Sequence, residues 1–258
     1  MDLLIDVGNT KIKWAYAIDY QLKVRGSSVF KASDFSEIGE LLKLKEFLPK
    51  RVFFSSVLSN NISDNLKHII LQSHSCVVYQ IRTVNHFLDI SVCYDQVSTF
   101  GVDRWLSLIG AYDKYRKAVM VADLGSAITI DLINSSGVHQ GGLITAGVGK
   151  ALGSLSSCSL LPDINCASFF KQQKVEHLSC NTSEAMINGV CLSVSSLLNY
   201  QAELQLTEHQ QDLKLVLTGG DSELILPLLN HDWELSSSLL FDGLLVLSKH
   251  ENLLEYFI

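Results

Sequence analysis

The chain has 258 residues, of which 47% are hydrophobic and only 18% are charged. This composition excludes long disordered stretches, and the length allows one or two domains with a sizeable core. Twenty basic and 27 acidic residues leave a formal charge of -7, which argues against a surface that binds nucleic acid by neutralising phosphates.

The sequence also argues against export and membrane insertion. The segment from Met1 to Asp6 has no basic stretch, and no apolar run approaches the roughly 18 residues of a spanning helix. The six cysteines form no Cys-x-x-Cys pair, so we expect reduced thiols rather than a zinc site or a disulfide framework. We therefore expect a soluble, cytoplasmic protein without nucleic-acid or membrane partners.

The elements predicted in the first half alternate between apolar strands and helical patterns. The chain opens with a strand at 3–7 that ends in Asp-x-Gly, followed by a second strand at 12–18. Ser33 is a candidate N-cap for a helix that runs toward Phe47. The remaining elements predicted here are strands at 52–57 and 77–81 and helices at 61–72 and 104–115.

The second half opens in the same way. After a strand at 118–122, Asp-x-Gly recurs at Asp123, 117 residues after Asp6, and strands at 129–133 and 138–145 complete a three-strand meander. A capping-box pattern at Asn181 and Glu184 opens a long helix toward residue 206, and a strand at 213–217 precedes a short helix. We predict a duplicated α/β architecture with halves 1–117 and 118–258 and a cleft between them.

Each Asp-x-Gly motif is predicted to form a tight hairpin turn in which glycine adopts a backbone geometry that other residues resist. Such a turn suits phosphate binding, because successive N–H groups and hydroxyls donate to phosphate oxygens and the carboxylate binds a metal ion or its water. A simple glycine turn with an Asx hydrogen bond is the alternative, and the duplication weighs against it.

The glycines at 147 and 149 do not form a P-loop. The first glycine of that motif would fall on Ile144, and Ala151 stands where a magnesium-binding hydroxyl is needed. A dinucleotide fingerprint fails because Leu152 occupies its third glycine position. We expect Gly141, Gly142 and Gly147 to permit close approach of backbone to a ligand or to other backbone.

The segment Gly101-Val102-Asp103-Arg104 opens a predicted helix with a carboxylate beside a guanidinium. An aspartate there accepts the proton of an attacking hydroxyl, and an arginine binds a carboxylate or phosphoryl group with two parallel hydrogen bonds. A surface ion pair at a helix N-terminus is the alternative.

Taken together, these motifs resemble the type III pantothenate kinases of the actin, hexokinase and Hsp70 superfamily, whose fold is a pair of ribonuclease-H-like domains. The matching segments follow one another from residue 6 to residue 221: Asp6-Val7-Gly8-Asn9-Thr10, Tyr94, Gly101-Val102-Asp103-Arg104, Asp123-Leu124-Gly125-Ser126-Ala127, Gly141-Gly142, Asn181-Thr182 and Thr218-Gly219-Gly220-Asp221.

The resemblance implies an ATP-dependent kinase for pantothenate, active as a homodimer with Mg²⁺ and K⁺ or NH₄⁺. It implies Asp103 as catalytic base, Asp123 at the monovalent cation, and Asp6 toward magnesium. The implied ATP-binding residues are Asp6, Val7, Gly8, Asn9, Thr10, Lys11, Ile12, Lys13 and Ser126. The implied pantothenate-binding residues are Tyr94, Gly101, Val102, Asp103, Arg104 and Thr182, the last completing the pocket near the dimer interface.

The chain departs from the family pattern at four positions. Ser126 replaces threonine and keeps the hydroxyl, whereas Ile128 replaces a threonine and loses one. Val97 and Ala146 replace prolines, which we expect to affect loop stiffness. Two other functions stay open at this point: a non-catalytic transcription accessory protein on the same scaffold, and a kinase or phosphatase with another substrate.

Overall fold

The computed structural model describes residues 1–29, 48–73, 75–158, 161–162, 178–209 and 212–250. The chain forms two compact units: unit 1 comprises Met1–Lys114 with Ser238–Ile258, and unit 2 comprises Tyr115–Ser237. The C-terminal segment from Ser238 thus packs with the first unit, whereas the predicted division after residue 117 assigned it to the second half. The predicted helix over 33–47 and Cys166 lie outside the described residues.

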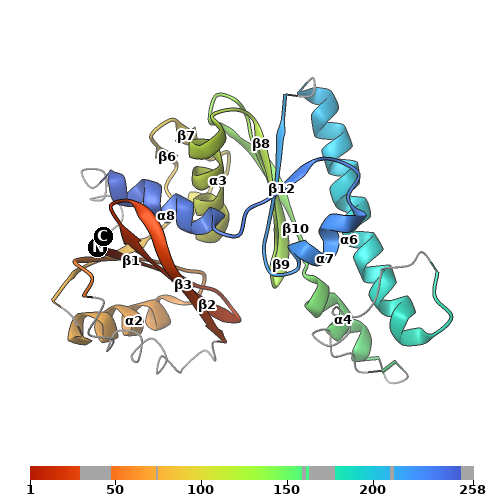
Figure 1. The fold of residues 1–258 in the computed structure, drawn as a ribbon, viewed down its shortest axis with the longest axis horizontal. Helices are drawn as coiled ribbons and strands as arrows, with labels where there is room; N and C mark the ends of the chain where they lie inside the picture. The colour runs from red at the N-terminus through yellow and green to blue at the C-terminus, as the bar shows by residue number, and fades with distance from the viewer. Residues whose placement is uncertain (30–47, 74, 159–160, 163–177, 210–211, 251–258) are drawn as a thin grey trace. The chain divides into compact units, whose positions relative to one another are not determined.

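Unit 1 contains a five-stranded sheet in which an antiparallel meander is extended by two parallel strands (Figure 1). From edge to edge the strands are β3 (Gln21–Val29), β2 (Lys11–Ile18), β1 (Asp2–Val7), β4 (Arg51–Ser56) and β5 (Val77–Ile81). Two short strands, β6 (His86–Phe87) and β7 (Ile90–Ser91), form a separate ribbon.

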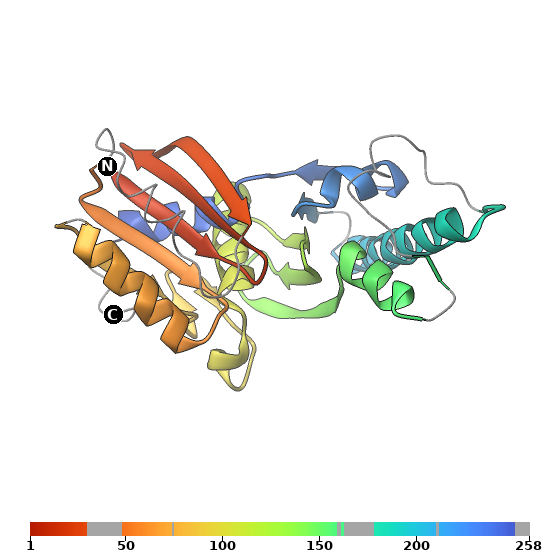
Figure 2. The same cartoon turned by 90° about the horizontal axis from the view of Figure 1, so that it is seen from below.

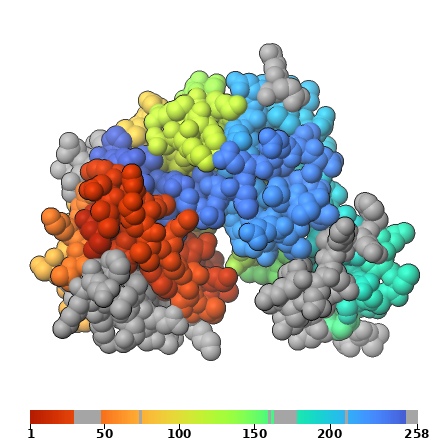
Figure 3. Space-filling model, viewed as in Figure 1, coloured from red at the N-terminus to blue at the C-terminus, as the bar shows by residue number. Residues whose placement is uncertain are grey.

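The edge strand β3 was not predicted, because its mixture of basic, serine and glycine residues has few apolar side chains to bury. Most of its residues are exposed, and Figure 3 shows the N-terminal strands, in red, at the surface of unit 1. Its pairing places β2 inside the sheet, with β1 on one side and β3 on the other.

Helices cover both faces of this sheet, which explains why every residue of β1 is buried. On one face, Leu66 and Ile70 of α2 (Asn60–Ser73) pack against alternate residues of β1, including Leu3 and Ile5. Figure 2 shows α2 running alongside the strands, and in Figure 1 the helix α8 (Leu239–Lys249) lies on the opposite side.

Two glycines bring α8 against α3 (Val102–Tyr115). A Cβ atom on Gly243 would overlap the backbone carbonyl of Leu106, and one on Gly110 would overlap the backbone carbonyl of Leu239. The two helix backbones therefore pack in direct contact, which joins the C-terminal segment to unit 1.

Unit 2 repeats the strand order of unit 1, which confirms the predicted duplication. Its strands are β10 (His139–Ala146), β9 (Ala127–Ile133), β8 (Val119–Leu124), β11 (Lys214–Thr218) and β12 (Trp233–Leu235). The first three again form an antiparallel meander, and β11 and β12 run parallel to β8. The two sequence motifs therefore mark equivalent hairpins of two α/β units.

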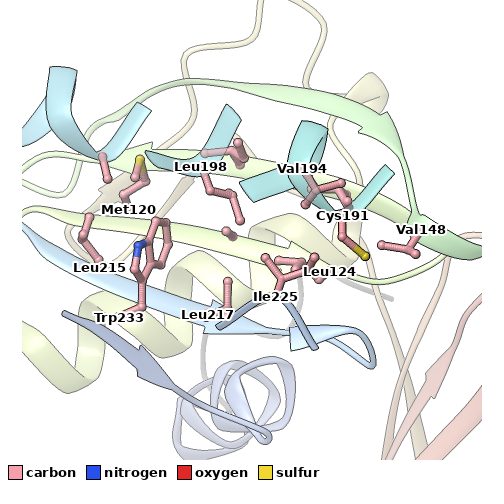
Figure 4. Packing of buried hydrophobic residues seen from close by; sticks show 14 of the residues in the cluster. Met120, Leu124, Val148, Cys191, Val194, Leu198, Leu215, Leu217, Ile225 and Trp233 are labelled. Carbon is pink, nitrogen blue, oxygen red and sulfur yellow. The ribbon is translucent and has the colours of Figure 1, made fainter. Parts of the chain in front are cut away.

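One face of the unit 2 sheet forms its hydrophobic core (Figure 4). The labelled residues of this core are Met120, Leu124, Val148, Cys191, Val194, Leu198, Leu215, Leu217, Ile225 and Trp233. The helices of unit 2 are α4 (Val148–Ser156), α6 (Thr182–Glu208) and α7 (Ser222–Ile225), with a 3₁₀ turn at Leu226–Leu228. As predicted, Asn181 caps α6: its side chain accepts a 2.9 Å hydrogen bond from the Glu184 N–H.

None of the described helices is long and apolar enough to cross a bilayer. The five cysteines in the described ranges are free thiols.

Asp242 makes the stability of unit 1 pH-dependent. Burial raises the pKa of this carboxyl, against smaller opposing effects of the Ser238 hydroxyl and of Lys114. The folded state therefore binds a proton more tightly than the unfolded state, so stability declines as the pH rises from the ordinary aspartate range through the raised pKa. Asp242→Asn should remove this decline in urea unfolding series across pH, whereas Asp64→Asn, at an exposed position of α2, should leave it unchanged.

Candidate functional site

The first Asp-x-Gly motif forms the predicted hairpin turn between β1 and β2, closed by a 3.0 Å hydrogen bond from the Gly8 N–H to the Lys11 carbonyl. Asp6 is buried at the end of β1, whereas Asn9 and Thr10 are exposed in the turn. Val7 and Ile12 are the two apolar residues of this predicted ATP-binding stretch, and their side chains lie in the core beside α2. Only their backbone groups are therefore placed to meet a ligand.

The predicted reason for glycine in these turns is wrong. The residues with positive φ include neither Gly8 nor Gly125. Space is the tighter constraint at Gly8, where a Cβ atom would lie 3.2 Å from the Lys11 carbonyl oxygen. At Gly125 a Cβ atom would lie 3.4 Å from Oδ1 of Asp123, which is ordinary van der Waals contact.

Sheet register surrounds Asp6 with polar residues. Asp6 is directly opposite Lys13 of β2 and directly opposite Ser55 of β4, so the three side chains share one face of the sheet. The buried Ser55 hydroxyl donates a 3.1 Å hydrogen bond to Oδ1 of Asp6, and Lys13 is exposed. Lys13 is thus a lysine of an interior strand, directly opposite the carboxylate.

Ser55 was missed in the sequence because it is 49 residues from Asp6 and follows an unremarkable apolar run. Only the parallel pairing of β1 with β4 reveals the contact. We expect Ser55→Ala to lower the free energy of unfolding by about 1.5–3 kcal/mol, because it removes a hydrogen bond to a buried carboxylate. The matched control is Ser248→Ala, which removes an equally buried hydroxyl that donates to the Leu245 carbonyl within α8. Equal decreases in the free energy of unfolding of the two variants, measured with urea, would contradict the expectation.

Unit 2 has an equivalent arrangement around Asp123. This carboxylate is directly opposite Thr129 of β9 and Thr218 of β11, so hydroxyl residues flank it on both neighbouring strands. Gly219 adopts φ +98° beside it, and a Cβ atom there would lie 2.5 Å from Oδ1 of Asp123. A side chain at 219 would therefore collide with the Leu124 backbone and with the Asp123 carboxylate.

The remaining predicted residues of unit 2 lie at the surface. Ser126 is exposed in the hairpin turn, and Thr182 is exposed at the first position of α6.

Gly147 approaches the Gly125 and Ser126 backbone closely, as expected for this glycine. Ile128 is fully buried in the unit 2 core, so a side chain at this position faces the core and the replacement of threonine removes no surface hydroxyl.

The Asp103 side chain at the start of α3 leaves little room for a side chain at Gly101. Oδ1 of Asp103 accepts a 2.9 Å hydrogen bond from the Arg104 N–H and folds back over Gly101, where a Cβ atom would lie 2.5 Å from it. A carboxylate in the first turn of a helix is stabilised by the positive end of the helix dipole. Asp103 is half-buried, so it remains accessible from solvent.

Arg104 is held by two aromatic side chains. Its guanidinium carbon lies 4.6 Å from the ring centre of Phe100 and 5.7 Å from that of Tyr94, and its Nη1 donates a 3.1 Å hydrogen bond to the Tyr94 hydroxyl. The guanidinium is buried, with Arg104 6% exposed. Phe100 was missed as a member of this cluster, because its place in the loop before α3 does not reveal where its ring points.

The predicted residues lie in both units. Unit 1 holds the Asp6 hairpin, where the unpredicted Ser55 joins Asp6, and also the Tyr94–Arg104 group; Val102 of the latter is buried in the first turn of α3. In unit 2, Asp123 and Ser126 belong to the hairpin between β8 and β9, and Thr182 opens α6. Among the described residues no three His, Cys, Asp or Glu side chains gather into a metal cluster.

Comparison with known proteins identifies a family. A family model described as type III pantothenate kinase matches residues 2–203. A type III pantothenate kinase of Nitrosococcus oceani is 29% identical over an aligned length of 265 residues. The alignment covers 96% of this chain and 94% of that protein.

Solved structures agree on the fold. One described as a Baf family transcriptional activator from Campylobacter jejuni has a TM-score of 0.62 at 23% identity and covers 97% of this chain and 100% of that one. The ROK hexokinase of Thermus thermophilus has a TM-score of 0.50 at 11% identity, with 95% of this chain and 96% of that chain covered. These similarities confirm the predicted fold class of duplicated, actin-like α/β domains.

Proposed function

The chain belongs to the type III pantothenate kinase family, and from that premise we propose that it transfers the γ-phosphoryl group of ATP to the primary hydroxyl of pantothenate. The product is 4'-phosphopantothenate, formed in the first step of coenzyme A biosynthesis.

The observation that carries this proposal is the first turn of α3. There a solvent-accessible carboxylate, Asp103, is adjacent to a buried guanidinium, Arg104, whose central carbon lies over two aromatic rings. A carboxylate suits a general base for a hydroxyl, and a planar guanidinium suits a substrate carboxylate. Pantothenate presents both groups. Tyr94, Gly101 and Val102 line this part of the proposed pocket.

The phosphates of ATP are proposed to lie along the Asp6–Lys13 hairpin. The turn offers the backbone N–H groups and exposed polar side chains of Asn9 and Thr10, and the exposed Lys11 and Lys13 add positive charge. Ser126, in the equivalent turn of unit 2, is proposed to contact the nucleotide through its hydroxyl.

The residues near Asp6 suit Mg²⁺, which prefers hard oxygen ligands. Asp6 offers a carboxylate whose orientation is restrained by Ser55, and magnesium typically keeps waters and phosphate oxygens rather than a cage of protein ligands. When bound, the ion supplies charge neutralisation on the phosphates. Asp123, flanked by the hydroxyls of Thr129 and Thr218, is proposed to help bind K⁺ or NH₄⁺.

In the proposed reaction the hydroxyl oxygen of pantothenate attacks the γ-phosphorus in line with the bond to the ADP oxygen. That bond breaks, its electron pair leaves with ADP, and the hydroxyl proton moves to the carboxylate of Asp103. Arg104 binds the carboxylate of pantothenate.

We further propose that the protein is a cytoplasmic homodimer. Thr182 is exposed at the N-terminus of α6 in the single chain, which suits a residue that completes the substrate pocket at a subunit interface.

Coupled turnover with ATP, pantothenate, Mg²⁺ and K⁺ tests the function. ADP release that depends on pantothenate is expected, and a folded dimer without turnover in this mixture would refute it. Thermal shifts with each ligand alone and in combination separate the alternatives, because a ligand that binds the folded state raises its stability. ATP hydrolysis without pantothenate binding would favour another substrate, and binding of neither ligand would favour a regulatory protein.

A further inference from the structure

Phe100 lies at the centre of an aromatic cluster beside the start of α3. Its ring centre is 4.8 Å from that of Tyr94, at an interplanar angle of 53°, and 4.6 Å from the guanidinium carbon of Arg104. Phe100 is 2% exposed. The guanidinium therefore packs against a ring that is itself enclosed by protein.

The backbone of Phe100 is also restrained. Its carbonyl accepts a 2.8 Å hydrogen bond from the Thr83 hydroxyl, and its N–H donates over 3.0 Å to the Val97 carbonyl across the 3₁₀ turn Val97–Thr99. These hydrogen bonds restrain the backbone of Phe100, and burial restrains its ring. The ring thus provides a rigid surface for the flexible arginine side chain.

An aromatic ring acts on a guanidinium differently from a polar partner. It attracts the cation through its face, whereas all five N–H donors of arginine point outward in the guanidinium plane. Packing over the Phe100 ring therefore restrains the guanidinium without using a donor. A carboxylate bound with two parallel hydrogen bonds requires this plane to be correctly oriented.

We propose that Phe100 is a positioning residue that orients the Arg104 guanidinium and thereby selects acceptors that carry a carboxylate. The inference rests on the proposed function, in which Arg104 binds the carboxylate of pantothenate. It adds a residue that does not itself hydrogen-bond the substrate, and it predicts a selectivity rather than a loss of chemistry.

Phe100→Leu tests the inference, since leucine keeps an apolar side chain but lacks the aromatic face. We expect the KM for pantothenate and its Kd by calorimetry to rise about tenfold, as the loss of a desolvated cation–π contact implies. The kcat at saturation and the KM for ATP should stay within about twofold of wild type. For the pantothenate analogue with a hydroxymethyl group in place of the carboxylate, the KM should change much less.

The matched control is Phe87→Leu. Phe87 is 3% exposed and packs edge-on against Trp105, the residue after Arg104, at 6.0 Å between ring centres. The Phe87→Leu variant should lose about as much thermal stability as Phe100→Leu, while its KM for pantothenate stays at the wild-type value. Phe100→Met, whose unbranched and flexible side chain adapts to irregular spaces in a core, makes the same test if the leucine variant does not fold.

Arg104→Gln in combination with Phe100→Leu isolates the coupling, because the effect of Phe100→Leu should disappear once the guanidinium is gone. An unchanged pantothenate KM and Kd in Phe100→Leu, or an equal rise in Phe87→Leu, would overturn the inference while the kinase function stands. Wild-type protein that neither binds nor phosphorylates pantothenate would overturn the proposed function, and the inference with it.

Discussion

Asp103→Asn should lower kcat for pantothenate phosphorylation by about 10²–10⁴-fold, the usual contribution of a general base. The amide keeps the shape of the side chain, and its oxygen can still accept the Arg104 N–H hydrogen bond that orients Asp103. It cannot take up the proton of the attacking hydroxyl. Steady-state coupled assays at saturating ATP and pantothenate measure the loss, and circular dichroism establishes that the variant is folded.

Asp95→Asn provides the comparison for this variant. Asp95 is exposed in the loop between β7 and α3, adjacent to Tyr94, so the substitution removes a nearby negative charge without touching the proposed base. We expect its kcat within about twofold of wild type, since exposed charges interact weakly through water. Wild-type turnover by Asp103→Asn would show that another group accepts the proton.

Gly243→Ala should destabilise unit 1 by about 3 kcal/mol, near the upper end of the usual cost of overpacking. The added methyl group would overlap the backbone carbonyl of Leu106, which cannot rotate away as a side chain can. α8 and α3 must therefore separate. Urea unfolding monitored by tryptophan fluorescence reports the loss, because Trp105 lies fully buried in α3.

Gly189→Ala shows what the same substitution does without the clash. Gly189 is exposed within α6, and a Cβ atom there meets nothing within 4 Å. Alanine should stabilise this helix by about 0.5–1 kcal/mol, the usual difference in helix propensity. A lower free energy of unfolding for Gly243→Ala and a higher one for Gly189→Ala would confirm close helix packing at Gly243. A higher free energy of unfolding for Gly243→Ala would contradict it.

The consequence of Gly243→Ala for catalysis follows from the position of α3. The clash occurs at Leu106, within one turn of Asp103 and Arg104, so a shifted α3 carries both proposed site residues with it. Small displacements of catalytic groups reduce rates strongly. The variant should therefore lose turnover at temperatures where it remains folded.

Features that depend on neighbours in the chain were readable from the sequence. The two hairpins follow from an apolar strand, Asp-x-Gly and a second strand, and the repeat of this pattern from Asp6 to Asp123 indicated the duplication that the matching strand orders confirm. The Asn181 cap needed only Glu184 three residues later. Such signals are local, because turns and helix ends are determined by a few adjacent residues.

The departures have a common cause. β3 was missed because an exposed edge strand has little apolar periodicity. The residues of α8 were assigned to the second half because sequence order does not show which unit a terminal segment packs against. Both features depend on pairing or packing with segments far away in the chain.

The sequence by itself determined which residues we propose to carry the chemistry: the carboxylates at two strand ends and the carboxylate and guanidinium that open α3. Only the tertiary structure decided what holds them. Ser55 reaches Asp6 because β1 and β4 pair in parallel, Phe100 reaches Arg104 because the loop before α3 turns its ring inward, and Gly243 allows α8 to approach α3. Supporting contacts of this kind depend on register and close packing, which no short stretch of sequence records.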